Sequence, residues 1–175
     1  MLFRSRRMTT PNVDRFGTLT DGFAFRVEGD LHVAEIAAGP ERSVEQFCSL
    51  ADHMPPVVDF SMWCVRSNRR FAGEGLALAE VSDVVGRLKV PLMASGGVEL
   101  AVFTGEEQVA LSPLLDLWIY AKSDRWYYLL LGLGLEERSE LRRRTWTMTR
   151  GDFTGAPELV EAVSAAAKRL TLKRS

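Results

Sequence analysis

Residues 115–134, LDLWIYAKSDRWYYLLLGLG, are the stretch on which the expected fold depends. Two apolar runs rich in aromatic and β-branched residues flank the polar tetrapeptide KSDR at 122–125, and this pattern predicts a β-hairpin. In a hairpin with a symmetric turn, cross-strand partners lie on the same face of the sheet. One face of this hairpin is therefore expected to supply core residues, namely Leu117, Ile119, Ala121, Trp126, Tyr128 and Leu130.

The second face of the predicted hairpin is also apolar. A hairpin with one face in water alternates apolar and polar residues, and this one does not, because Asp116 is the only charged residue away from the turn. We therefore expect the hairpin to lie centrally in the sheet, with its second face either covered or offered to a partner. That second face carries Trp118, Tyr120, Tyr127, Leu129 and Leu131.

The composition of the chain is typical of a soluble globular protein. Its 175 residues, 46% of them hydrophobic and 26% charged, fit a single domain. The formal net charge is -1, so no overall field recruits nucleic acid or an anionic membrane, and no apolar run is long enough to span a bilayer. Residues 1–12 are predicted to be a mobile basic tail, and residues 13–175 a single α+β domain.

Strand patterns and turn dipeptides dominate the rest of the chain. They predict a meander over 17–37, a strand over 57–65, a hairpin over 98–112 and a strand over 145–149. Helices are predicted from Ser43 to the prolines at 55–56, over 76–89, and from Pro157 towards the C-terminus, with a basic loop over 66–75. These elements predict an α+β fold, with a mostly antiparallel sheet of about 7–9 strands and three helices, the last at the C-terminus.

The titratable residues form no motif typical of a catalytic or metal-binding site. The two histidines, His32 and His53, have no ligand at metal-binding spacing, so we expect neither a metal nor a cofactor. Asp59 and Asp116 lie within predicted strands, where burial would raise a carboxyl pKa and suit acid–base chemistry. The cysteines at 48 and 64 are expected to be reduced thiols in a cytoplasmic protein.

Residues 90–98, VPLMASGGV, resemble the phosphate-binding stretch of certain (β/α)8 barrels of histidine and tryptophan biosynthesis. That resemblance implies a loop in which glycine N–H groups approach a phosphate and a helix follows. It covers nine residues, however, and the pattern that follows is a strand rather than a helix. We therefore interpret Ser95, Gly96 and Gly97 as a turn.

Two arginine groups, residues 66, 69 and 70 and residues 142–144, would form an anion-binding or RNA-binding patch if they converged. Trp63 or Trp146 would then be available for stacking. Three glutamates at 136, 137 and 140 adjoin the second group and favour local pairing instead. The sequence does not place the two groups relative to each other, and Arg142 and Arg143 remain candidate binding residues.

The missing catalytic motifs and the aromatic hairpin together predict a non-catalytic, cytoplasmic protein-binding module, such as an inhibitor, an immunity-type protein or an adaptor. Its partner would be another protein or a second copy of the chain, and neither a membrane nor nucleic acid is expected. The candidate binding residues are Trp118, Tyr120, Tyr127, Arg142 and Arg143. One alternative is a small-molecule-binding protein with an apolar cavity between the sheet and the C-terminal helix. Another is a small enzyme that uses Asp59, Asp116 or His53.

The expected tail can be tested by limited proteolysis. Residues 1–12 show no apolar periodicity, so removing them should leave the melting temperature unchanged. A large drop in melting temperature after trimming would show that these residues pack against the domain.

Overall fold

The structure, a computed structural model of the chain, describes residues 21–141 and 155–175. These residues form one antiparallel sheet of 8 strands with 4 helices. The expected α+β class and strand number are confirmed, whereas the expected number of helices was one too low. The predicted tail at 1–12, the predicted strand at 145–149 and the candidate residues Arg142 and Arg143 lie outside the described residues.

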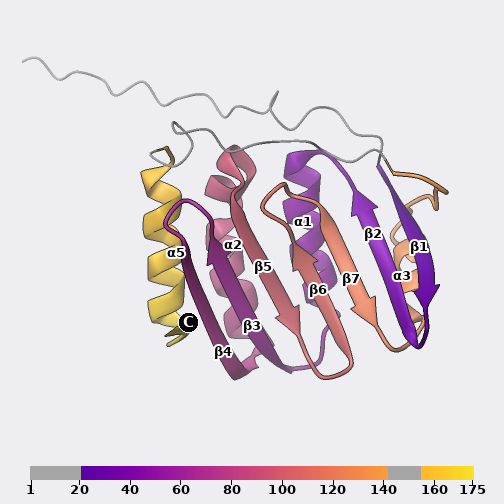
Figure 1. Cartoon of the computed structure of the whole chain (residues 1–175), viewed down its shortest axis with the longest axis horizontal. Helices are drawn as coiled ribbons and strands as arrows, with labels where there is room; N and C mark the ends of the chain where they lie inside the picture. Colours follow the sequence, from indigo (N-terminus) through magenta and orange to yellow (C-terminus); the bar gives the residue numbers. More distant parts are fainter. Residues whose placement is uncertain (1–20, 142–154) are drawn as a thin grey trace, which may run out of the picture.

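The order of strands in the sheet differs from their order in the chain (Figure 1). From one edge to the other the sheet runs β1-β2-β7-β6-β5-β3-β4-β8. The strands are β1 (Gly22–Glu28), β2 (Leu31–Ala37), β3 (Val57–Cys64), β4 (Arg69–Ala77), β5 (Val98–Phe103), β6 (Glu107–Leu111), β7 (Leu117–Ala121) and β8 (Lys173–Arg174). The helices are α1 (Pro40–Ala51), α2 (Leu78–Ser95), α3 (Arg125–Gly132) and α5 (Pro157–Arg169).

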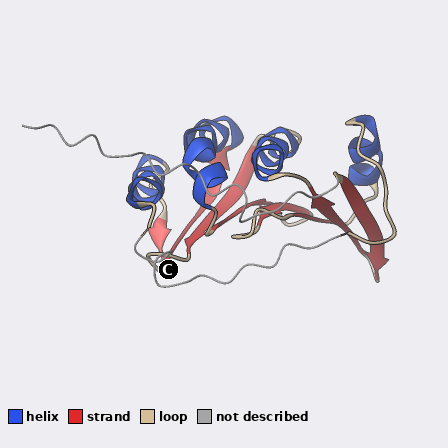
Figure 2. Ribbon diagram, turned by 90° about the horizontal axis from the view of Figure 1, so that it is seen from above, coloured by secondary structure: helices blue, strands red, loops and turns tan. Residues whose placement is uncertain are grey.

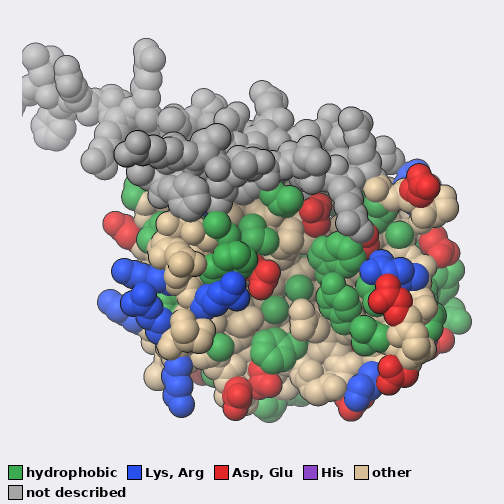
Figure 3. All heavy atoms as spheres, in the orientation of Figure 1, with side chains coloured by type: hydrophobic (Ala, Val, Ile, Leu, Met, Phe, Trp, Pro, Cys, Tyr) green, Lys and Arg blue, Asp and Glu red, His purple; other side chains and the backbone are tan. Residues whose placement is uncertain are grey.

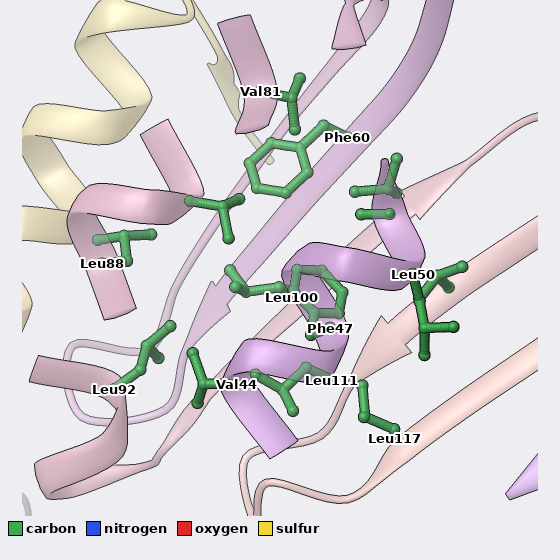
Figure 4. Packing of buried hydrophobic residues seen from close by; sticks show 14 of the residues in the cluster. Val44, Phe47, Leu50, Phe60, Val81, Leu88, Leu92, Leu100, Leu111 and Leu117 are labelled. Carbon is green, nitrogen blue, oxygen red and sulfur yellow. The ribbon is translucent and has the colours of Figure 1, made fainter. Parts of the chain in front are cut away.

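The described helices all lie on one face of the sheet, as Figure 2 shows. Side chains alternate between the two faces of a strand, so every second residue points into the layer between sheet and helices. Phe47 of α1 and Leu88 of α2 point towards Phe60 and Leu100 of the sheet in this layer (Figure 4). All four side chains are buried. The core is thus a single layer between the sheet and its helices.

Helix α1 begins at Pro40, three residues before the predicted start at Ser43. A proline suits the first helical turn because its missing N–H would have had no partner within the helix. Ser43 consequently lies inside the helix, where its hydroxyl donates a hydrogen bond to the carbonyl oxygen of Ala38 at 3.2 Å. Helix α2 also exceeds its prediction, since it continues past Pro91 to Ser95 and keeps Leu92 buried.

The predicted hairpin is wrong in its second half. β7 pairs with β2 on one side and with β6 on the other, so no free edge remains for the run at 126–131. That run forms α3 instead, and Trp126 and Leu130, four residues apart, both point into the core. The expected burial of Leu117, Ile119, Trp126 and Leu130 is nevertheless confirmed, but Tyr128, which was expected on the same buried face, is 64% exposed on α3.

A carboxylate at the start of β6 holds the first turn of α3. Glu107 accepts hydrogen bonds from Arg125 at 2.6 and 2.9 Å and from the indole Nε1 of Trp126 at 2.7 Å. The Glu107 side chain is only 10% exposed, so these charge-assisted bonds satisfy a carboxylate that is largely removed from water. Arg125 also lies over the Trp126 ring, 4.5 Å from its centroid. The sheet thereby fixes where α3 begins.

The predicted loop over 66–75 is also wrong, because most of it belongs to β4. β4 pairs along β3, and on its other side it pairs, among the described residues, with the two-residue strand β8 alone. A strand near the edge of a sheet needs few apolar side chains and commonly carries charges. Because β4 contains charged residues and glycines, its sequence pattern predicted a loop instead of a strand.

The packing of α3 can be tested with two adjacent leucines. Leu130 is fully buried, so Leu130→Ala should lower the free energy of unfolding by about 2–5 kcal/mol in denaturant titrations. Leu131 is 41% exposed and provides the matched control, with an expected cost of no more than about 0.5 kcal/mol for Leu131→Ala. Equal losses in the two variants would contradict the observed orientation of the helix.

Candidate functional site on the sheet face opposite the helices

The sheet face opposite the described helices, called here the outer face, is assembled from strands that are distant in sequence. Its middle row follows directly from the strand register. Trp118 of β7 pairs with Glu35 on one side and with Ala110 on the other. The row then continues through Ala101, Ser61 and Ala72 to Lys173. A run of small side chains thus separates Trp118 from the basic end of the sheet.

An aromatic stack stands at the β7 end of this row. The rings of Trp118 and Tyr120 lie 6.3 Å apart with an interplanar angle of 10°. The guanidinium of Arg26, which is ion-paired with Glu28, lies 5.8 Å from the centroid of Trp118. Both rings are half-buried, so each keeps part of its surface in contact with solvent. Arginine and large aromatic side chains of this kind commonly dominate binding energy at protein interfaces.

Burial raises the pKa of the Tyr120 phenol above its ordinary value, while the charge of Arg26 opposes this effect. The phenol therefore stays protonated at neutral pH. A protonated phenol both donates and accepts hydrogen bonds. Tyr120 can consequently offer a neutral polar contact within an otherwise aromatic cluster.

Further aromatic side chains extend the outer face beyond the stack. Phe103 of β5 lies in the row of Tyr120, because both residues pair with Gln108 of β6. Trp63 of β3 lies beneath the guanidinium of Arg70, which is 4.2 Å from the ring centroid. The Trp63 Nε1 is buried and finds no acceptor among the described residues. In Figure 3, hydrophobic side chains gather over the central strands, and Lys and Arg side chains gather towards β4.

The structure brings together only two of the candidate binding residues. Trp118 and Tyr120 share the outer face, as expected. Tyr127 does not join them, because it belongs to α3 and packs on the helix side of the sheet against Phe23 and Phe25, at centroid distances of 5.9 and 5.0 Å. The expectation that Tyr127, Leu129 and Leu131 share a face with Trp118 was therefore wrong. Arg142 and Arg143 are not part of the described structure.

Phe103 and Trp63 were not among the candidate binding residues. The alternation in VELAVF places Glu99, Ala101 and Phe103 on one side of their strand, and this signal was present in the sequence. It does not say which strands are neighbours, however. Only the strand order β7-β6-β5-β3 brings Phe103 and Trp63 onto the same surface as Trp118.

The two carboxylates of the enzyme alternative lie far apart. Asp59 pairs with Phe103, and its Oδ1 accepts a hydrogen bond from the backbone N–H of Gly75 at 2.9 Å. Asp116 immediately precedes β7, three strands away. Sheet spacings of about 4.8 Å between strands and about 3.3 Å per residue put the two residues on the order of 20 Å apart. They cannot act together on one bond.

The glycine stretch at 95–97 ends a helix rather than beginning one. The guanidinium of Arg66, which is almost completely buried, donates hydrogen bonds to the carbonyl oxygens of Ser95 at 2.8 Å and Gly96 at 2.5 Å. Carbonyl oxygens at a helix C-terminus attract cations and repel anions. Gly96 and Gly97 thus connect α2 to β5, whereas Ser95, expected in a turn, is the last residue of α2, and the phosphate-binding geometry implied by the resemblance is absent.

Two other kinds of site are absent from the parts of the chain that the structure describes. Residues 21–141 and 155–175 hold no group of three or more His, Cys, Asp or Glu side chains that could bind a metal ion. None of the described helices is long and apolar enough to cross a membrane. The outer face is therefore the candidate site with the most extensive support.

The different roles of Arg66 and Arg69 can be tested by stability measurements. Arg66→Gln removes buried charge-assisted hydrogen bonds and should lower the free energy of unfolding by about 1.5–3 kcal/mol. Arg69 is exposed, so Arg69→Gln should change this free energy by less than about 0.5 kcal/mol. An unchanged free energy of unfolding in Arg66→Gln would mean that the end of α2 does not depend on the hydrogen bonds from Arg66.

Comparisons with known proteins give no family assignment. No family model matches the chain, and no match is found among curated proteins or solved structures. The functional conclusion accordingly depends on the geometry of the described residues.

Proposed function

We propose that the chain is a non-catalytic protein-binding module that uses the outer face to bind another protein or a second copy of itself. The observation that supports this proposal most strongly is the aromatic stack of Trp118 and Tyr120, with Arg26 over the Trp118 ring, on the sheet face opposite the described helices. Aromatic and arginine side chains are the residues most enriched at the energetic centres of protein interfaces. Inhibitors, immunity-type proteins and adaptors are the classes that act by such binding alone.

The chemistry of the outer face supports a protein partner over a small ligand. Its aromatic groups are distributed across several strands, from Tyr120 on β7 to Trp63 on β3. Charged residues, including Arg26 and Arg70, alternate with them and supply polar contacts. An apolar centre with a polar rim is the usual composition of a protein interface.

A cytoplasmic location belongs to the same proposal. Cys48 and Cys64 are both free, and the thiol of Cys64 is buried in the core. Proteins that keep buried free thiols are typical of reducing compartments. Burial also raises the pKa of Cys48, so its thiol is protonated and poorly nucleophilic at neutral pH.

The proposal can be tested by placing a charge in the centre of the outer face. Ala110 pairs with Trp118 and points away from the helices, so Ala110→Glu adds a carboxylate beside the stack without entering the core. Affinity capture followed by reconstitution with the purified partner should show at least about a tenfold rise in Kd. Analytical ultracentrifugation of the chain alone measures association with a second copy.

Ala165→Glu is the matched control, since it adds the same charge at an exposed position on α5 in the helix layer. Circular dichroism should show that both variants fold. Loss of binding in Ala110→Glu with binding retained in Ala165→Glu supports the outer face as the interface. Equal binding by the two variants would place the partner elsewhere and contradict the proposal.

A further inference from the structure

A groove of about 360 Å³ separates β4 from the C-terminal helix α5. It is a second surface, distinct from the outer face, because Phe71 and Arg69 point from β4 towards the helix side of the sheet. The groove is open to solvent and lies within the volume range of small-molecule sites. Its lining comprises Arg69, Phe71, Ser164, Ala167, Lys168, Thr171 and Leu172.

The groove is positively charged without compensation among the described residues. Its two charged side chains, Arg69 and Lys168, are both exposed cations, and neither forms an ion pair with a described acidic residue. No carboxylate is among the lining residues. Arg174 of β8 pairs in register with Phe71 and adds a third cation to the same edge of the sheet. An anion would therefore be attracted to this groove.

The groove on the other side of α5 provides a contrast. It lies between α2 and α5, and its cations, Arg87 and Arg169, both form ion pairs with Asp83, at 3.3 and 2.9 Å. Its charges are therefore already neutralised within the chain. Of these two grooves, only the one at β4 presents cations that are left for a ligand.

The remaining lining residues are suited to a ligand that is part anion and part apolar. Ser164 and Thr171 carry hydroxyl groups, which donate hydrogen bonds to phosphate oxygens. Thr171 has a positive φ of 53°, a conformation that is uncommon for a β-branched residue. Its backbone N–H bonds to the carbonyl of Lys168 in the turn that ends α5, which holds the two residues together. Phe71 and Leu172 supply apolar surface beside them.

We propose that the β4–α5 groove binds a small phosphate monoester, with the phosphate at Arg69 and Lys168 and the rest of the ligand against Phe71 and Leu172. Arginine matches the geometry of a phosphate through two parallel N–H bonds, and lysine adds a mobile positive charge. This inference does not depend on the proposed function, because none of these residues belongs to the outer face.

The test uses adenosine monophosphate as the probe, with inorganic phosphate and adenosine as its two separated halves. Binding at low ionic strength is measured by titration with NMR detection of the Ser164 and Thr171 amide signals. Adenosine monophosphate should bind more tightly than either half, because only it contacts both the cations and the apolar surface. Arg69→Gln and Lys168→Gln should each raise its Kd by about tenfold.

Arg87→Gln is the matched control, since it removes an arginine from the neutralised groove and should leave the Kd unchanged. Ala110→Glu, on the outer face, should also leave it unchanged, so failure of this inference is distinguishable from failure of the proposed function. Unchanged affinity in Arg69→Gln would overturn the inference. So would equal binding of adenosine, equal binding of inorganic phosphate, or no signal change at millimolar probe. Tighter binding of a single-stranded oligonucleotide would instead assign this basic edge to nucleic acid and overturn it as well.

Discussion

One-sided burial is the constraint on which the rest of this structure depends. Along the central strands, every second side chain enters the layer beneath α1 and α2, and these residues account for most of the core. Leu117, Leu111 and Leu100 lie side by side in this layer because their strands are neighbours in register. Along each strand, the residues that alternate with these core residues must point to the opposite face, whatever their side chains are. The outer face is therefore a geometric consequence of packing the core, and its aromatic residues are what require a functional explanation.

The sequence patterns predicted local elements well and failed where neighbouring elements decide the outcome. The hairpin formed by β5 and β6, the strand β3 and the start of α5 at Pro157 were all predicted correctly. The run after Asp124 was not, because Trp126 and Leu130 are spaced by four residues. That spacing puts two side chains on one face of either a strand or a helix. The helix is favoured because β7 is paired on both edges and because Glu107 accepts hydrogen bonds from the first turn of α3. Neither interaction can be recognised from the local sequence pattern.

The candidate site was predictable only in the part that lies within one strand. Trp118 and Tyr120 are two residues apart, so any strand through 117–121 places them on one face. Phe103 and Trp63 reach the same surface because β5 and β3 follow β6 in the sheet, although β3 precedes both β5 and β6 in the chain. Long-range strand order depends on how the connecting helices pack, which hydrophobic periodicity does not encode. Tyr127 was wrongly predicted to lie on this surface because the segment at 126–131 was taken for a strand. In the helix α3 that it forms, the Tyr127 side chain lies on the helix side of the sheet.

Net charge conceals the electrostatic character of this molecule. The formal charge of -1 gives no reason to expect an anion site. Many cationic side chains nevertheless already form ion pairs within the chain. Examples are the pairs Arg125–Glu107, Lys89–Glu45 and Arg87–Asp83. Exposed pairs of this type contribute little to stability, but each lowers the local potential. Arg69 of β4, Lys168 of α5 and Arg174 of β8 lack such partners among the described residues, so positive potential accumulates around them. A charged ligand is attracted by the local distribution of unpaired charges rather than by the net charge of the chain. This local distribution differs between the two sides of α5.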